Sequence, residues 1–201
     1  MNENDSIIGD QSRNKAVLRR EMKGRLREVS DARLAQSLSL VTEHLKEGLA
    51  DLGEADCVGL FGGLRGEPDL VKDLGPWLRG RGAATAVFSF GPDGMIPRKV
   101  VSEADVQRGA LGVWEPVPAR APALRTNALT VVLVPGMAFS RSGERLGRGG
   151  GYYDRLLHEV GLKARIIGVA IDSLLGDSLP MEPHDQRVQE IVTDSGWISC
   201  R

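Results

Sequence analysis

The N-terminal part of the chain carries apolar residues at the spacing of amphipathic helices. A first helix is predicted over residues 14–29. Its apolar residues are Leu18, Met22, Leu26 and Val29. Ser30 then stands where a second helix needs a capping hydroxyl. The apolar stripe expected for this second helix consists of Leu34, Leu38, Val41, Leu45 and Leu49.

Short apolar runs bounded by glycine, proline and polar residues follow, and they predict β-strands. The runs are DCVGLF (56–61), AATAVFSF (83–90), MIPRKVV (95–101), ALTVVLVP (128–135), ARIIGVAI (164–171) and QEIVTD (189–194). GPDG, at 91–94, predicts a turn between the second and third runs. We expect QEIVTD to be the last strand of the chain.

Helices are predicted between several of these strands. Pro68 suits the first turn of a helix that runs through Leu78, because a residue at that position needs no N–H. Another helix is predicted over residues 152–160. Strands that alternate with helices indicate an α/β fold with a mainly parallel sheet. We expect a single domain over residues 14–201, preceded by a flexible N-terminal segment, residues 1–13.

Composition narrows the range of partners. The 201 residues include 26 Lys and Arg and 27 Asp and Glu, for a formal net charge of −1. Such a balance favours neither a nucleic-acid nor a membrane partner. Cys57 and Cys200 form no disulfide framework and are interpreted as reduced thiols. We therefore expect a cytoplasmic protein, monomeric, that acts on small molecules.

The segment RLGRGGGYYD, residues 145–154, is the strongest candidate for chemistry. It follows a buried strand and opens a helix, which is where α/β proteins bind ligands. Glycines let backbone N–H groups close on an anion, and Arg145 and Arg148 offer fork-shaped donors for phosphate oxygens. The alternative is a flexible connection with solvated arginines. The segment is not the common GxxxxGK[ST] loop, so its residues alone leave both interpretations open.

Other candidate residues also have two interpretations. Asp154 could complement the dipole of the following helix or hold Mg²⁺. Lys15 and Arg19 share one helix face, which is either solvated or a second cationic group. Glu67 is either a capping residue or an acceptor for a ligand's N–H groups. Tyr152 and Tyr153 could stack on a flat ring or pack on the sheet, and His184 beside Asp185 is weak evidence for a metal site or a catalytic dyad.

Five segments, in this order, resemble the 5-formyltetrahydrofolate cyclo-ligase family. They are KAVLRREMKGRL, FGGLRGEPDL, LGVWEPVP, LVPGMAFSRSGERLGRGGGYYDRLL and EPHDQRVQEIVTD. Together they extend from Lys15 to Asp194, almost the whole chain. The resemblance implies a three-layer α/β/α fold, similar to that of ribose-5-phosphate isomerase and CoA transferases. It also implies an ATP- and Mg²⁺-dependent enzyme that closes 5-formyltetrahydrofolate to 5,10-methenyltetrahydrofolate with release of ADP and phosphate.

Residue roles follow from the resemblance, position by position. The ATP-binding positions are Lys15, Ala16, Val17, Leu18, Arg19, Arg145, Leu146, Gly147, Arg148, Gly149, Gly150, Gly151, Tyr152 and Tyr153. The folate-binding positions are Gly62, Glu67, Arg148, Gly149, Gly150, Gly151 and Tyr152. Asp154 and Asp185 match Mg²⁺ positions, and Arg145 and Arg148 are the expected catalytic residues.

The chain departs from the family at two places. SFGPDG replaces a proline-containing segment of many relatives, and Gly150 replaces a lysine of some relatives. Two other functions stay open: a non-catalytic folate- or nucleotide-binding relative, and a sugar-phosphate enzyme of the same fold class.

Overall fold

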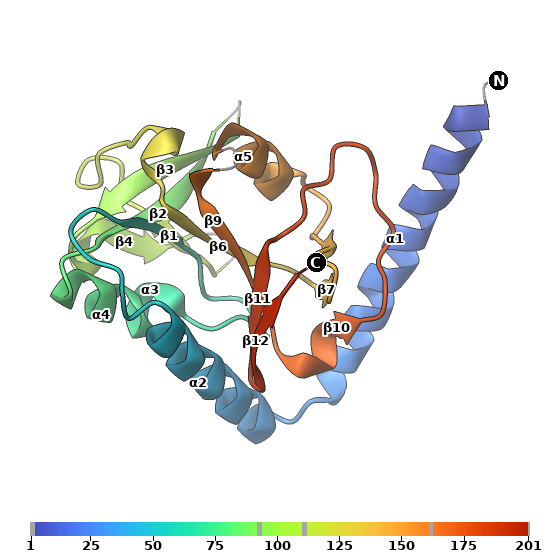
Figure 1. Ribbon diagram of the computed structural model, residues 1–201, viewed down its shortest axis with the longest axis horizontal. Helices are drawn as coiled ribbons and strands as arrows, with labels where there is room; N and C mark the ends of the chain where they lie inside the picture. Colours follow the sequence, from blue (N-terminus) through green and yellow to red (C-terminus); the bar gives the residue numbers. More distant parts are fainter. Residues whose placement is uncertain (1–2, 92–93, 110–111, 161–162, 201) are drawn as a thin grey trace.

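A seven-stranded sheet forms the centre of the molecule (Figure 1). The structure is a computed structural model that describes residues 3–91, 94–109, 112–160 and 163–200, with side chains from residue 14 onward. In spatial order the strands are β12 (Gly196–Ser199), β11 (Glu190–Thr193), β9 (Arg165–Val169), β6 (Val131–Pro135), β1 (Cys57–Leu60), β2 (Ala84–Gly91) and β3 (Gly94–Val100). The inner strands from β11 to β2 run parallel, and both edge strands, β12 and β3, pair antiparallel to their neighbours. The predicted α/β fold with a mainly parallel sheet is confirmed.

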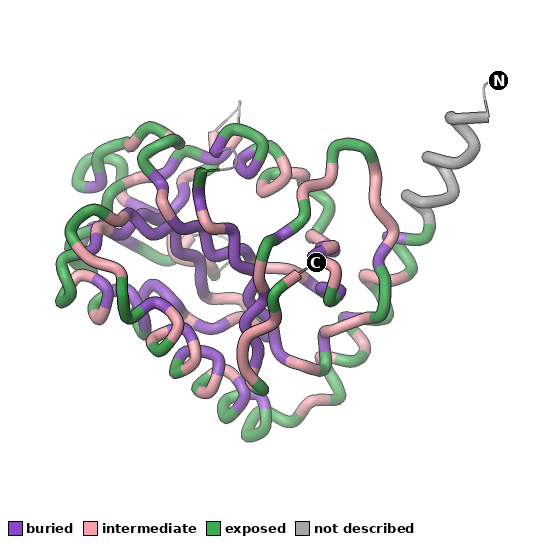
Figure 2. Tube along the Cα trace, in the orientation of Figure 1, coloured by how far each residue is buried: buried purple, intermediate pink, exposed green. Residues whose placement is uncertain are grey.

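Helices cover both faces of this sheet. The helices α2 (Asp31–Gly48), α3 (Leu70–Asp73) and α4 (Gly75–Gly80) lie along one face, and α5 (Tyr152–Val160) lies on the other (Figure 1). Because side chains alternate along a strand, β6 supplies both cores. Val131 and Leu133 belong to the cluster under α2 to α4, whereas Val132 and Val134 belong to the cluster under α5. The buried strands between exposed helix faces (Figure 2) give three layers, α/β/α.

The first two helices follow their apolar stripes. Met22 of α1 (Glu3–Glu28) is buried against the core, and the side chain of Ser30 accepts from the backbone N–H of Arg33 at the start of α2. The helix α1 begins at Glu3, earlier than predicted, so it continues through most of residues 1–13; the flexibility of that segment stays a prediction.

The prediction of one helix from Pro68 through Leu78 is wrong in its extent, because the chain forms two short helices there. These helices are α3 and α4, and the side chain of Asp69 caps the first by accepting from the N–H of Lys72. Pro76 lies in the first turn of α4. Since Pro76 has no N–H and its ring disfavours a helix through the preceding turn, a single continuous helix cannot form.

Several short strands were not predicted. QEIVTD is not the last strand, because Gly196, with φ of +123°, turns the chain into β12, which pairs back on β11. Five further strands are too short for an apolar pattern to mark. They are β4 (Val106–Arg108) with β5 (Trp114–Pro116), and β7 (Ala138–Ser140) with β8 (Arg145–Leu146) and β10 (Leu175–Gly176). Of the predicted GPDG turn, residues 92 and 93 lie outside the described residues.

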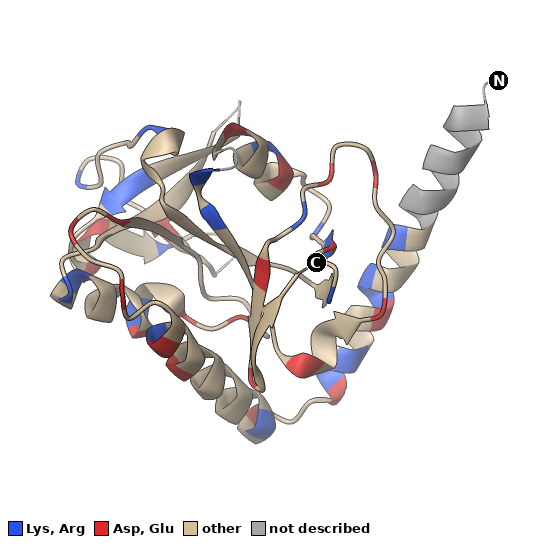
Figure 3. Ribbon diagram, viewed as in Figure 1, with Lys and Arg blue, Asp and Glu red and all other residues tan. Residues whose placement is uncertain are grey.

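Along α1 from residue 14 onward the charged residues are mostly basic, whereas α2 carries charges of both signs (Figure 3). Among the described residues, no helix is both long and apolar enough to cross a membrane.

Candidate functional site

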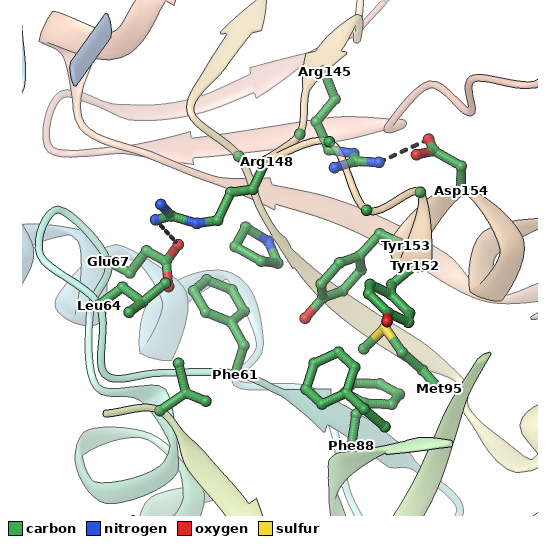
Figure 4. Close-up of a pocket in the computed structure, with 18 of the residues that line it drawn as sticks. Phe61, Leu64, Glu67, Phe88, Met95, Arg145, Arg148, Tyr152, Tyr153 and Asp154 are labelled. Atoms are coloured by element: carbon green, nitrogen blue, oxygen red, sulfur yellow. Dashed lines mark hydrogen bonds and ion pairs between the residues drawn. The ribbon is translucent and has the colours of Figure 1, made fainter. Parts of the chain in front are cut away.

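A cavity of about 360 Å³ opens at the carboxyl ends of β1, β2 and β6, the edge where α/β sheets gather ligands (Figure 4). Its apolar lining consists of Leu60, Phe61, Leu64, Val87, Phe88, Phe90, Met95, Val113, Trp114 and Pro135. Its charged lining consists of Lys15, Arg19, Glu67, Arg145, Arg148, Asp154, Glu182, His184 and Asp185. The cavity therefore combines a wall suited to a flat apolar ring with a wall suited to phosphates.

The glycine loop, residues 147–151, forms part of this lining between β8 and α5. Gly149 and Gly151 have φ of +105° and +64°, in the region that side-chain-bearing residues rarely adopt. The Nε of Arg19 donates to the carbonyl of Gly147 at 2.8 Å, so α1 holds the loop in place. The loop leads directly into the first turn of α5, whose unpaired N–H groups favour an anion.

Arg145 lies in β8 behind the glycine loop, with a side chain only 4% exposed. Its Nη2 donates to Oδ1 of Asp154 at 2.7 Å, and the same oxygen accepts from the backbone N–H of Gln186 at 3.2 Å. The Nε–H of Arg145 has no acceptor among the described residues, although it is buried. A buried donor left unpaired is costly, so this N–H indicates a place for an oxygen atom of a ligand.

Arg148 and Glu67 meet across the cavity in an ion pair (Figure 4). The Nη2 of Arg148 lies 2.7 Å from Oε1 of Glu67, and the arginine side chain is 47% exposed whereas that of the glutamate is 7% exposed. Burial raises the pKa of Glu67 above its usual range, and the charge of Arg148 opposes that rise. Glu67 thus needs a donor in its buried position, and Arg148 is the donor within its reach.

Tyr153 occupies the middle of the cavity wall, with its hydroxyl directed toward the cavity (Figure 4). Its ring meets that of Phe88 edge-on at 6.2 Å, and the guanidinium of Arg145 lies 5.8 Å from the ring centroid. Burial, and after it the charge of Glu67, raises the pKa of the Tyr153 hydroxyl above its usual value. The hydroxyl therefore stays protonated and can donate to a ligand.

A cluster of acidic groups faces α1 on the charged wall. Lys15 is buried, and its Nζ lies 2.8 Å from Glu182 and 2.5 Å from Asp185. His184 also lies beside both carboxylates, and one ligand atom from each of the three residues falls within 4.8 Å of the others. The carboxylates of Glu182 and Asp185 are oxygen donors, which fit a hard divalent cation. The ammonium of Lys15 lies between these two carboxylates. The donor set therefore fits Mg²⁺.

Most of the predicted site residues lie around this one cavity. Those that line it are Lys15, Arg19, Gly62, Glu67, Arg145, Gly147, Arg148, Gly149, Gly150, Gly151, Tyr152, Tyr153, Asp154 and Asp185. Ala16, Val17, Leu18 and Leu146 do not line it: Ala16 and Val17 are exposed on α1, Leu18 packs on the core and Leu146 is buried in it.

Several residues that line the cavity were not predicted from the sequence. Glu182 stands three positions before Asp185 in EPHD. Its carboxylate, so close in sequence to a predicted metal ligand, was a signal that it belongs to the same cluster. Phe61, Phe88 and Phe90 lie at or near the carboxyl ends of predicted strands, where side chains reach the ligand edge of the sheet. Met95 comes from an antiparallel edge strand, and only the structure brings it to this cavity.

Comparison with known families matches residues 11–194 to the 5-formyltetrahydrofolate cyclo-ligase family. A 5-formyltetrahydrofolate cyclo-ligase of Mycolicibacterium smegmatis is 45% identical over 87 residues, which cover 43% of this chain and 45% of that protein. For this relative, the matched stretch thus spans less than half of its length. The mouse 5-formyltetrahydrofolate cyclo-ligase is 26% identical over 198 residues, which cover 92% of this chain and 96% of the mouse protein.

A solved structure has a similar fold. The NMR structure of Aquifex aeolicus 5,10-methenyltetrahydrofolate synthetase matches with a TM-score of 0.73 and 27% sequence identity, over 93% of both chains.

Proposed function

Because the chain belongs to the 5-formyltetrahydrofolate cyclo-ligase family, we propose that it converts 5-formyltetrahydrofolate to 5,10-methenyltetrahydrofolate, using ATP and Mg²⁺ and releasing ADP and phosphate. The observation that carries the proposal is the cavity with two kinds of wall. An aromatic wall fits a pterin, and a cationic wall built on the glycine loop fits the phosphates of ATP. The reaction needs both substrates side by side.

The chemistry follows from the poor reactivity of a formamide. Its oxygen is a poor leaving group, and delocalisation from N5 makes its carbon a poor electrophile. Transfer of the γ-phosphoryl group from ATP to the formyl oxygen releases ADP and activates the carbon. N10 then attacks that carbon, the oxygen departs as phosphate, and the proton of N10 goes to the phosphate. Such a sequence needs positioning and charge neutralisation more than a protein nucleophile.

The residues of the cationic wall have separate roles in this proposal. Arg145, with its unpaired Nε–H, donates to an oxygen of the transferring phosphoryl group. Arg148, which belongs to the glycine loop and lines the same cavity, neutralises charge on the same group. Arg19 keeps the loop in its conformation through the carbonyl of Gly147, while the backbone N–H groups at the start of α5 receive the remaining phosphate oxygens.

Mg²⁺ has oxygen ligands available on the same wall. Asp185 would hold the ion together with Glu182 of the same cluster, and Asp154, which lines the same cavity and pairs with Arg145, would be the further ligand. When bound, Mg²⁺ would neutralise negative charge on the phosphates of ATP. Lys15 lies against Glu182 and Asp185 on the same wall, where its ammonium group can donate to a phosphate oxygen.

The folate side of the cavity pairs one carboxylate with an aromatic wall. Glu67 accepts hydrogen bonds from the N–H groups of the pterin's pyrimidine ring, in the region where Arg148 now satisfies it. Phe61 and Phe88 enclose the flat ring, and Tyr153 donates from the middle of the wall.

A spectrophotometric assay tests the proposal. Purified protein with 5-formyltetrahydrofolate should produce methenyl absorbance only when ATP and Mg²⁺ are both present. Arg145→Ala should lower kcat by a factor on the order of 100, because one donor to developing charge is lost. Folded wild-type protein that binds both substrates without turnover would instead identify a non-catalytic relative.

A further inference from the structure

The segment LGVWEPVP has no part in the reaction described so far, although it places an aromatic side chain in the cavity wall. Trp114, the first residue of β5, lines the cavity, and its backbone N–H donates to the carbonyl of Gly62 at 3.3 Å. Gly62 also lines the cavity, and the loop that follows it leads to Glu67, the acceptor proposed for the pterin. Trp114 therefore adjoins the folate side of the site.

A carboxylate holds the indole of this tryptophan. The Nε1–H of Trp114 donates to both carboxylate oxygens of Asp69, at 2.7 Å to Oδ1 and 2.9 Å to Oδ2. Trp197, in contrast, donates to the backbone carbonyl of His44 and does not line the cavity. Because a hydrogen bond to a carboxylate is stronger than one to a neutral carbonyl, Asp69 fixes the orientation of the Trp114 ring more firmly.

Two cations complete this arrangement. The Nη2 of Arg108 lies 3.1 Å from Oδ2 of Asp69, and the guanidinium lies 4.0 Å from the centroid of the Trp114 ring. The ammonium of Lys72 lies 4.9 Å from the same centroid. Cations at these distances attract an indole ring. The ring is thus oriented by three charged groups before any ligand enters the cavity.

Asp69 also packs on the glycines that open the loop to Glu67. A Cβ at Gly62 would lie 3.0 Å from Oδ1 of Asp69, and a Cβ at Gly63 would collide with the guanidinium of Arg108. The side chain of Asp69 is 24% exposed. Since Asp69 stands two positions after Glu67 in the chain, one carboxylate contacts the start of this loop, follows its end and holds the neighbouring ring.

We infer that Asp69 is a positioning residue for folate binding, which acts through the indole of Trp114. The inference rests on the proposed function and gives a role to a carboxylate that does not itself line the cavity. A side chain already held in its binding orientation loses less freedom when a ligand binds. The cap on α3 does not need this arrangement, because it uses Oδ1 alone, at 3.4 Å from the N–H of Lys72.

A double-mutant cycle tests whether Asp69 acts through Trp114. The Kd of 5-formyltetrahydrofolate is measured by calorimetry, without ATP, for wild type, Asp69→Asn, Trp114→Phe and the double variant. Asparagine caps a helix as well as aspartate does, but its amide has only one oxygen to offer the indole. Phenylalanine keeps an aromatic ring in the wall and has no N–H. Asp73→Asn is the matched control, because Asp73 is an exposed carboxylate of the same short helix that does not line the cavity.

Asp69→Asn and Trp114→Phe should each raise the Kd of 5-formyltetrahydrofolate roughly five- to tenfold, and the double variant should bind no more weakly than the weaker single variant. The Kd of ATP should stay unchanged in all variants, and Asp73→Asn should match wild type. Four results would overturn the inference: losses that multiply in the double variant, an equal loss of affinity for ATP, an Asp69→Asn variant with the Kd of wild type, or an equal loss in Asp73→Asn.

The NMR signals of the indole N–H groups give a second readout, which a role of Asp69 in the helix cap alone would not move. The chain has three tryptophans, and Trp114→Phe identifies the signal of Trp114 by its loss. Asp69→Asn should shift this signal upfield, because the hydrogen bond to a carboxylate is lost, and 5-formyltetrahydrofolate should move it in wild type. A Trp114 signal that responds to neither change contradicts the inference.

The binding measurements separate this inference from the proposed reaction. Wild type that binds 5-formyltetrahydrofolate but forms no methenyl product refutes the reaction alone, and the cycle still decides the role of Asp69. Wild type that binds no 5-formyltetrahydrofolate refutes both.

Discussion

Replacement of Arg148 by alanine removes the positive charge that pairs with the carboxylate of Glu67. The change leaves a carboxylate whose side chain is 7% exposed without the guanidinium that lies 2.7 Å away. Removing one partner of a fully buried ion pair costs about 3–5 kcal/mol. The Arg148 side chain is 47% exposed, so water already screens the pair and we expect about 1–2 kcal/mol. For a chain of this size, that lowers Tm by about 2–8 °C.

The loss should depend on pH. Burial raises the pKa of Glu67 in the native state, and without Arg148 the pKa rises further. An acid whose pKa is higher in the native state than in the unfolded chain binds more protons when folded. Native stability therefore falls as the pH rises from the unfolded pKa to the native pKa. The gap in stability between wild type and Arg148→Ala should be smallest in acid and largest at neutral pH.

Thermal unfolding of wild type, Arg148→Ala and Arg148→Ala/Glu67→Gln measures this gap at about pH 4.5 and about pH 7.5. The double variant is the matched control, because glutamine cannot ionise and the added pH dependence should disappear. A drop in Tm that is the same at both pH values, or one that the Glu67→Gln change does not reduce at neutral pH, would refute the reasoning.

Three further predictions concern the ligands and the backbone. Glu67→Gln should raise the Kd of 5-formyltetrahydrofolate by roughly tenfold, because one charge-assisted hydrogen bond is lost, and should leave the affinity for ATP unchanged. Calorimetry that finds equal losses of affinity for both ligands contradicts the role of Glu67 as the pterin acceptor. Asp154→Asn should raise the Mg²⁺ concentration needed for half-maximal turnover, and an unchanged magnesium titration leaves Asp154 only as the partner of Arg145. Gly66→Ala should lower stability by about 1–3 kcal/mol in denaturant unfolding, because φ is +85° and the new methyl group would lie 2.8 Å from a leucine of α1. In contrast, Gly24→Ala, in a helix with open space around it, should raise stability by about 0.5–1 kcal/mol; equal effects would show that backbone conformation is not the cause.

The elements predicted well are those whose signal is local. A hydroxyl residue before an apolar helical stripe is enough to predict a capped helix, and Ser30 does cap α2. In the same way, α5 begins at Tyr152, where the glycines end. β10 depends on a partner distant in the sequence, β7, whereas β12 and β8 pair with the strands that directly precede them. Two- and three-residue strands carry no periodicity of their own, so their pairing appears only in the folded chain.

The same distinction applies to the site. The glycine loop and Glu67 are marked by their own neighbours, and both line the cavity as expected. Lys15 and Asp185 were predicted to meet a phosphate and a metal ion; the sequence carries no sign that they also contact each other. Phe90 has the pattern of an ordinary strand residue, and its place in the cavity wall depends on where β2 ends relative to α5.

Contacts of α1 with the two ends of the site have a consequence for biosynthesis. Lys15 and Asp185 are 170 residues apart in sequence, and Arg19 and Gly147 are 128 apart. During translation α1 emerges from the ribosome before these two partners, so neither contact can form until residues 147 and 185 have been made. The part of the cavity wall that α1 contributes is thus completed only after the glycine loop and the acidic cluster have been synthesised.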